Sequence, residues 1–246
     1  MNAPASAQWG AWLAQLLATD APALPTAAAM QIGLHLGWSV VLAWLGVAAA
    51  VRWWPGQQSR SQRRWGVALL MALWAWAPGT YSAAYWLGLA FQAPSTVTVL
   101  LCAGLLWERL ARATVAPSPP GVVTSDRRVL ALATLGVLTG WALLLDTFAW
   151  LPVQLYAWGF SPAAPGLVLL LVLLPWVFGG SLAHSGRFLW WAVPVALLVL
   201  VVWRLPSGNV WDAVLDPLLW LALHGYVARA AWCRYRSTGS GGPSGE

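Results

Sequence analysis

The sequence predicts an all-α fold, a polytopic membrane protein with about seven transmembrane helices. The first reason is composition, because 60% of the 246 residues are hydrophobic and only 8% are charged, whereas a soluble domain carries roughly 25% charged residues. The second is the series of long apolar runs separated by short polar or proline-rich segments. The third is the arginines, which flank these runs almost entirely on one side. Together these features indicate a chain that lies in a bilayer.

The chain divides into three segments. In residues 1–24, Trp9, Trp12, Leu13, Leu16 and Leu17 recur at helical spacing without the basic start of a signal peptide. We therefore expect an amphipathic segment on the outer membrane surface. Residues 25–235 are predicted to form one transmembrane domain, a lead helix followed by three hairpins. Residues 236–246 are rich in Ser and Gly and are predicted to form a disordered cytoplasmic tail.

The predicted spans follow the apolar runs. They cover approximately residues 25–51, 65–78, 94–110, 129–151, 165–183, 188–203 and 217–232. The second run is shorter than the roughly 20 residues that cross a bilayer, so we expect it to continue past Pro78 with a kink. Two GxxxG patterns, Gly33 to Gly37 and Gly136 to Gly140, predict close helix packing. The 21 tryptophans are interpreted as interfacial anchors.

Orientation follows from the arginines, since loops rich in basic residues stay in the cytoplasm. One predicted side holds only Arg204, and the other holds Arg52, Arg60, Arg63, Arg64, Arg109, Arg112, Arg127, Arg128, Arg187, Arg229, Arg234 and Arg236. The N-terminus is therefore predicted outside and the C-terminus in the cytoplasm. The absence of lysine and the abundance of Ala, Leu, Trp and Pro are typical of a GC-rich bacterial genome, which places the chain in the inner membrane of a bacterium.

The sequence also carries an internal echo. Tyr85, Gly88 and Pro94 are repeated 71 residues later (156 − 85) as Tyr156, Gly159 and Pro165. Parallel repeats of this kind occur in transporters. Chance recurrence is the other explanation, because proline commonly starts helices and aromatic residues gather at interfaces.

A cluster of charged residues is predicted at the outer interface, formed by Asp146, Arg204, Asp212 and Asp216. Acidic residues near a membrane are candidates for function, but Asp216 directly before Pro217 is also a typical helix N-cap. We expect Arg204 to pair with Asp216, with Asp146 as the second choice. Such a pair either pins the last hairpin or serves transport or proton relay, and both interpretations remain open.

His35 and His224 are the candidate polar residues within the membrane. Two histidines at similar depth could ligate a haem, but a neutral histidine bonded to a neighbouring helix is the simpler interpretation. No cofactor and no metal site are therefore predicted. The sequence contains no Walker loop, GxSxG, HExxH or CxxC motif. The absence of lysine excludes both a P-loop and a retinal Schiff base.

These observations leave three hypotheses for function. The leading one is a non-enzymatic accessory or assembly subunit of a membrane complex, whose partners are the lipid bilayer and other membrane-protein subunits. The alternative is a small-solute permease built on the repeated hairpins. The third is a haem-binding protein or another membrane-embedded enzyme. A nucleic-acid partner is not predicted despite the net charge of +6, because the arginines flank apolar runs and form no soluble basic face.

Overall fold

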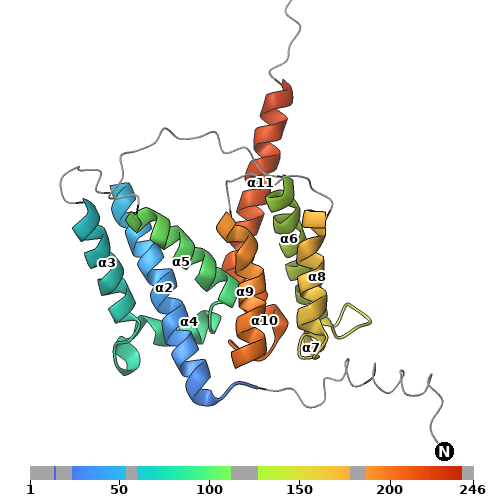
Figure 1. Ribbon diagram of the computed structural model, residues 1–246, viewed down its shortest axis with the longest axis horizontal. Coiled ribbons are helices and arrows are strands. Elements are labelled where there is room, and N and C mark those ends of the chain that lie inside the picture. Colours follow the sequence, from blue (N-terminus) through green and yellow to red (C-terminus); the bar gives the residue numbers. More distant parts are fainter. Residues whose placement is uncertain (1–13, 15–23, 54–59, 112–126, 178–186, 240–246) are drawn as a thin grey trace, which may run out of the picture.

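The computed structural model describes residue 14 and residues 24–53, 60–111, 127–177 and 187–239. All regular structure in these residues is helical, which confirms the all-α prediction. The long helices are α2 (Ala27–Trp53), α3 (Arg60–Trp74), α5 (Thr96–Ala111), α6 (Arg127–Thr147), α8 (Ala164–Val177), α9 (Arg187–Trp203) and α11 (Pro217–Gly239). They run alternately up and down between the two ends of a bundle (Figure 1).

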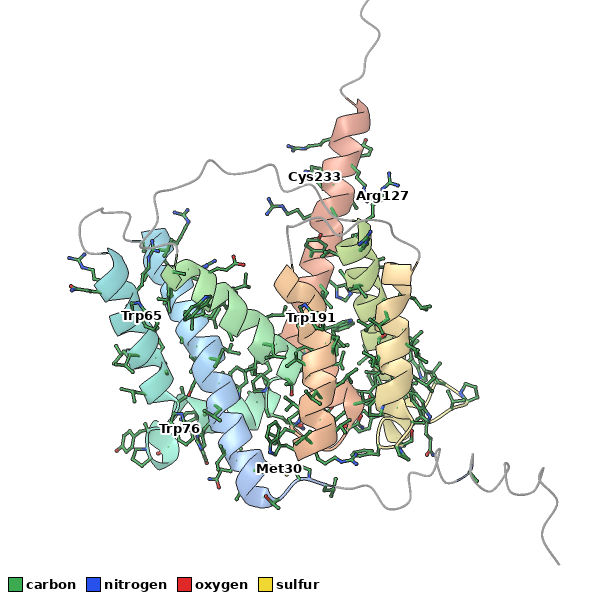
Figure 2. The ribbon with its side chains drawn as sticks, viewed as in Figure 1. Met30, Trp65, Trp76, Arg127, Trp191 and Cys233 are labelled. Atoms are coloured by element: carbon green, nitrogen blue, oxygen red, sulfur yellow. The ribbon has the colours of Figure 1, made fainter. Side chains whose placement is uncertain are left out.

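Short helices occupy the connections at one end of this bundle. They are η1 (Gly79–Tyr81), α4 (Ala83–Phe91), α7 (Leu155–Trp158) and α10 (Val210–Val214), and they lie at the same end as the start of α2 (Figure 1). We call this the aspartate end, because Asp146, Asp212 and Asp216 lie in or beside these connections. Figure 2 shows Met30 and Trp76 there, with Arg127 and Cys233 at the opposite end. We call this opposite end the arginine end, because α6 begins there with Arg127.

Two groups of helices pack side by side. In the first, α2 contacts α3, α4 and α5, and in the second, α6 contacts α8 and α11 while α9 contacts α8 and α10. Helix α5 joins the groups, because Val97 packs with the buried Ala192 and Ala196 of α9. Alanine at these two positions leaves room for the helices to approach closely.

Both GxxxG patterns lie at close helix contacts, as predicted. A Cβ added at Gly37 of α2 would come within 2.8 Å of the Pro94 side chain, directly before α5. A Cβ added at Gly140 of α6 would overlap the Trp220 ring of α11. Glycine at these positions therefore permits the α2–α5 and α6–α11 contacts.

Two of the described helices, α2 and α6, are long and apolar enough to cross a bilayer. Shorter apolar stretches cover Ala164–Leu174 in α8 and Trp191–Trp203 in α9. The prediction of seven spans is thus supported, by length and composition, for two helices.

The prediction for the second span is wrong. Helix α3 ends at Trp74 and does not continue past Pro78; η1 and α4 follow as separate elements. Gly79 adopts a φ of +56°, which turns the chain, and the hydroxyl of Ser82 donates to the carbonyl of Ala75 at 2.7 Å. Once the helix has ended, this side chain satisfies one of the carbonyls that no longer has a helical partner.

The terminal segments differ in how far the structure reaches them. Helix α11 extends to Gly239, so the first residues of the predicted disordered tail, from Arg236, are helical. Residues 240–246 lie outside the described residues. The predicted surface segment, residues 1–24, also lies outside them except for Ala14, which is helical, and Leu24.

Candidate functional site

The candidate site lies at the aspartate end, where each of the three predicted aspartates accepts hydrogen bonds from a connecting segment. Asp146 lies one residue before the last residue of α6. Its Oδ2 accepts the backbone N–H of Tyr156 at 2.7 Å. Because Tyr156 is in the first turn of α7, this carboxylate satisfies a backbone N–H that has no partner within the helix.

Asp212 links α10 to α7. Its Oδ2 accepts the phenol O–H of Tyr156 at 2.9 Å and also the hydroxyl of Ser207. The pKa of the Tyr156 phenol is raised well above its ordinary value. The largest cause is desolvation by burial, and the negative charge of Asp212 and its hydrogen bond to the phenol raise the pKa further. Tyr156 therefore stays a neutral donor to Asp212 at neutral pH.

Asp216 caps two helices at once. It is 9% exposed; its Oδ1 accepts the N–H of Leu219 in the first turn of α11, and its Oδ2 accepts the N–H of Ser95, both at 2.7 Å. Ser95, which is fully buried, in turn accepts the N–H of Thr98 at the start of α5. The N-cap predicted from Asp216 before Pro217 is therefore present, and the same carboxylate also joins α11 to α5.

The expected ion pair of Arg204 is not found. Within the part of the chain that the structure describes, no ion pair joins Arg204 to Asp146, Asp212 or Asp216. Asp146 and Asp216 instead accept backbone N–H groups in the first turns of α7 and α11. Arg204 follows the last residue of α9 with a φ of +59°, and its N–H donates to the carbonyl of Leu200 at 2.8 Å. It therefore ends the helix in the left-handed conformation that usually favours glycine.

The residue that the sequence did not single out is Asn209. It is fully buried; its Oδ1 accepts the N–H of Trp211 at 2.9 Å, and its Nδ2 donates to the carbonyl of Tyr156 at 3.0 Å. Asn209 is thus the N-cap of α10 and a link to α7. An asparagine shortly before an apolar helix is a typical N-cap signal, but the link to α7 exists only in the folded chain.

Close packing reinforces this link between the second and third hairpin connections. The indole N–H of Trp211 donates to the carbonyl of Leu155 at 2.8 Å. A Cβ added at Gly159 would overlap Asn209 and Trp211. Gly159 belongs to the second copy of the sequence echo, and Gly88 is its counterpart in the first. A Cβ added at Gly88 would lie 3.0 Å from the side chain of Leu34 on α2. Both glycines therefore lie at close contacts, while duplication itself remains a hypothesis.

The two histidines pack against different helices. Nδ1 of His35 on α2 lies 2.8 Å from the carbonyl of Ala75, which directly follows α3. On α11, Nε2 of His224 accepts the indole N–H of Trp141 on α6 at 3.1 Å, and Nδ1 lies 2.8 Å from the carbonyl of Trp220. Each ring thus serves a local contact, the arrangement expected of a neutral histidine bonded within the bundle.

A groove of about 940 Å³ opens beside the aspartate cluster. Its walls come from the first turns of α2, the end of α4, the α7 and α10 connections and the start of α11. Its polar lining includes Gln31, Gln92, Tyr156, Ser207, Asp212 and Asp216. Among the lining residues that the structure describes, two are acidic and none is basic, which gives this part of the groove a negative electrostatic character.

Comparison of the chain with models of protein families, with curated proteins and with solved structures finds no match. Among the described residues, no group of three or more His, Cys, Asp or Glu side chains is placed to hold a metal ion.

Proposed function

We propose that this chain is a multi-pass protein of a bacterial inner membrane, with seven spans, the N-terminus outside and the C-terminus in the cytoplasm. Three observations support this placement. The long helices alternate in direction between the two ends (Figure 1), α2 and α6 have the length and apolarity of spans, and basic side chains gather at one end. Tryptophans near helix ends are also exposed, among them Trp53, Trp150 and Trp203, as expected at a membrane interface.

The native cysteines provide a test of orientation. Cys233 is exposed near the arginine end, and Cys102 is buried. We expect an impermeant thiol reagent to label Cys233 only after the inner membrane is permeabilised, and Cys102 to resist in both conditions. In a Cys233→Ser background, Tyr81→Cys, at an exposed position of the aspartate end, should be labelled from the periplasm. Labelling of Cys233 in sealed cells would invert the topology.

Within the membrane, the proposed role is that of a non-enzymatic accessory or assembly subunit. The observation that carries this proposal is the contrast between the polar and the apolar groups. The aspartates serve as caps and links between connections, as expected of a structural cluster. The edge helix α3, by contrast, exposes Leu69, Leu70, Leu73 and Trp74, an apolar face that lipid or a partner's helix would cover.

Purification in mild detergent tests this role. We expect stoichiometric co-purification of other membrane proteins with the wild-type chain. A photo-crosslinking residue at position 70 should give an adduct with one of these partners, whereas the same residue at position 198, an exposed leucine of α9, serves as the matched control. A monodisperse homomer without partners, and adducts of equal yield at both positions, would contradict the proposal.

The second candidate function is a small-solute permease, which the groove beside Asp212 favours. Its volume of about 940 Å³ is within the range of small-molecule sites, and its acidic lining suits a small organic cation. Choline is a suitable probe. The permease hypothesis predicts saturable choline binding that Asp212→Asn weakens, whereas Asp146→Asn does not, since Asp146 does not line the groove. Absence of choline binding by the folded protein would leave the structural role alone.

A further inference from the structure

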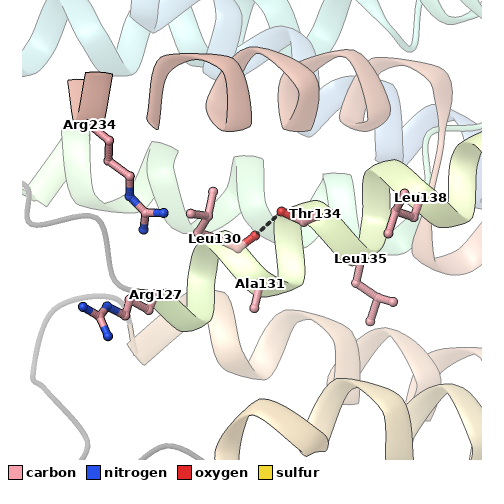
Figure 3. Close-up of a pocket in the computed structure, with 7 residues that line it drawn as sticks. All are labelled: Arg127, Leu130, Ala131, Thr134, Leu135, Leu138 and Arg234. Carbon is pink, nitrogen blue, oxygen red and sulfur yellow. Dashed lines mark hydrogen bonds between the residues drawn. The ribbon is translucent and has the colours of Figure 1, made fainter. Parts of the chain in front are cut away.

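A second groove, of about 860 Å³, lies at the arginine end of the bundle along α6 and α11 (Figure 3). Its floor is a row of side chains on successive turns of α6: Leu130, Ala131, Thr134, Leu135 and Leu138. Arg127, at the start of α6, and Arg234, near the end of α11, lie at its mouth. The groove thus combines an apolar trough with two guanidinium groups at one end.

The trough suits hydrocarbon. The one hydroxyl on its floor, that of Thr134, donates to the carbonyl of Leu130 at 2.8 Å, so it is already used within the helix. Leu138 is 60% exposed, which is unfavourable in water and favourable against an acyl chain. Ala131 is also exposed, and its small side chain keeps the trough open.

The mouth of the groove suits an anionic phosphate. Arg127 and Arg234 come from different helices and both are exposed, and the lining residues that the structure describes include no acidic one. Guanidinium groups bind phosphate oxygens through paired hydrogen bonds. Basic pockets between transmembrane helices on the cytoplasmic side are typical binding sites for anionic lipid headgroups.

We infer that this groove binds one anionic phospholipid of the cytoplasmic leaflet. The phosphate lies between Arg127 and Arg234, and an acyl chain follows the trough towards Leu138. The inference rests on the proposed membrane placement, in which the arginine end faces the cytoplasm. It goes beyond that placement by naming a specific site. A general attraction between arginines and anionic lipid would not depend on the trough, whereas binding at this site does.

The experiment measures thermal unfolding of the full chain in neutral detergent. The additives are phosphatidylglycerol, phosphatidylcholine with the same acyl chains, and inorganic phosphate. We expect phosphatidylglycerol to raise the melting temperature saturably, and the other two to have no comparable effect. Arg127→Gln and Arg234→Gln should each weaken the apparent affinity for phosphatidylglycerol about fivefold, and the double variant roughly twenty-five-fold.

Two further variants separate a built site from general electrostatics. Arg229→Gln removes an exposed arginine of α11, the helix that also carries Arg234, and Arg229 does not line the groove. The affinity for phosphatidylglycerol should therefore remain at the wild-type value. Ala131→Phe keeps both arginines but fills the trough, and it should abolish the selective effect. Each variant is first shown to melt near the wild-type temperature without added lipid.

Several outcomes would overturn the inference. Equal stabilisation by the two lipids would show that the headgroup is not recognised, and an equal effect of inorganic phosphate would show that the trough plays no part. Equal losses in Arg229→Gln and Arg127→Gln would indicate diffuse attraction. These results leave the proposed membrane placement intact, whereas recovery of the chain outside the membrane fraction, measured beforehand, would remove the basis of both proposals.

Discussion

The aspartate end and the arginine end differ in how their charged side chains are used. At the aspartate end, Asp212 and Asp216 accept backbone or hydroxyl donors from other segments of the chain. At the arginine end, Arg64 donates to the carbonyl of Arg109 at 2.9 Å, and Arg236 lies over the ring of Trp232 at 5.0 Å. Arg127 and Arg234 are exposed and line a groove there.

This difference follows from what each charge can bind. A carboxylate accepts hydrogen bonds, so it can satisfy the N–H groups that every helix leaves unpaired at its N-terminus. Helices α5 and α11 both begin at the aspartate end, and Asp216 serves both. A guanidinium only donates and carries a full charge, so at a membrane surface it matches lipid phosphates. Changes at the aspartate end should therefore reduce stability, and changes at the arginine end should alter lipid binding.

Asn209→Ala should have the largest effect of the substitutions considered, because it removes a fully buried cap and the bond to the carbonyl of Tyr156. Lost caps and buried groups left without partners each cost about 1–3 kcal/mol, so we expect the free energy of unfolding to fall by roughly 2–4 kcal/mol. Thermal or denaturant unfolding in detergent measures this. Asn209→Ser, which keeps a capping oxygen, should lose less; equal losses would assign the effect to packing alone.

Gly159→Ala should follow, because the added methyl would overlap Asn209 and Trp211. Overpacking of this kind typically costs about 1–3 kcal/mol. The matched control is Gly166→Ala in α8, where a Cβ has no neighbour within 4 Å and alanine favours the helix by roughly 0.5–1 kcal/mol. Opposite shifts in melting temperature are expected. If both variants were neutral, the two connections would not be tightly packed.

Tyr156→Phe should cost about 1 kcal/mol, because it removes one hydrogen bond to Asp212. It should also change the pH dependence of unfolding. The pKa of Tyr156 is raised in the folded protein, so the stabilising effect is complete below the ordinary tyrosine pKa of about 10 and is lost as the pH rises above it. The melting temperature should be measured between about pH 8 and 11, the range in which tyrosine begins to ionise. It should fall more steeply with rising pH for the wild type than for the variant.

Arg204→Ala should have the smallest effect. No ion pair of Arg204 with an aspartate is seen in the described chain, so the change should stay within about 0.5 kcal/mol. Its effect should also add to that of Asp216→Asn in the double variant, since residues that do not interact behave independently. A coupling above roughly 1 kcal/mol in this cycle would restore the ion pair expected from the sequence.

Part of the fold was predictable because it depends on local rules. Apolar runs and prolines indicate where the long helices lie, and two of the predicted bounds agree with the structure. The run predicted from Pro217 begins α11, and the run predicted to end at Trp203 ends α9. The N-cap of α11 follows from one aspartate before one proline. The two GxxxG patterns also correctly predict close contacts, because two glycines on one helix face leave space for a neighbour.

The sequence by itself determined that the chain is helical and which helix ends carry arginines. Helix formation and charge placement are properties of short segments. Tertiary structure decided the partners. It gave Asp216 the backbone of Ser95 instead of Arg204, and it joined α10 to α7 through Asn209. Each of these contacts connects residues far apart in sequence. Which donor reaches a given carboxylate or carbonyl depends on how whole helices pack, and no local pattern contains that information.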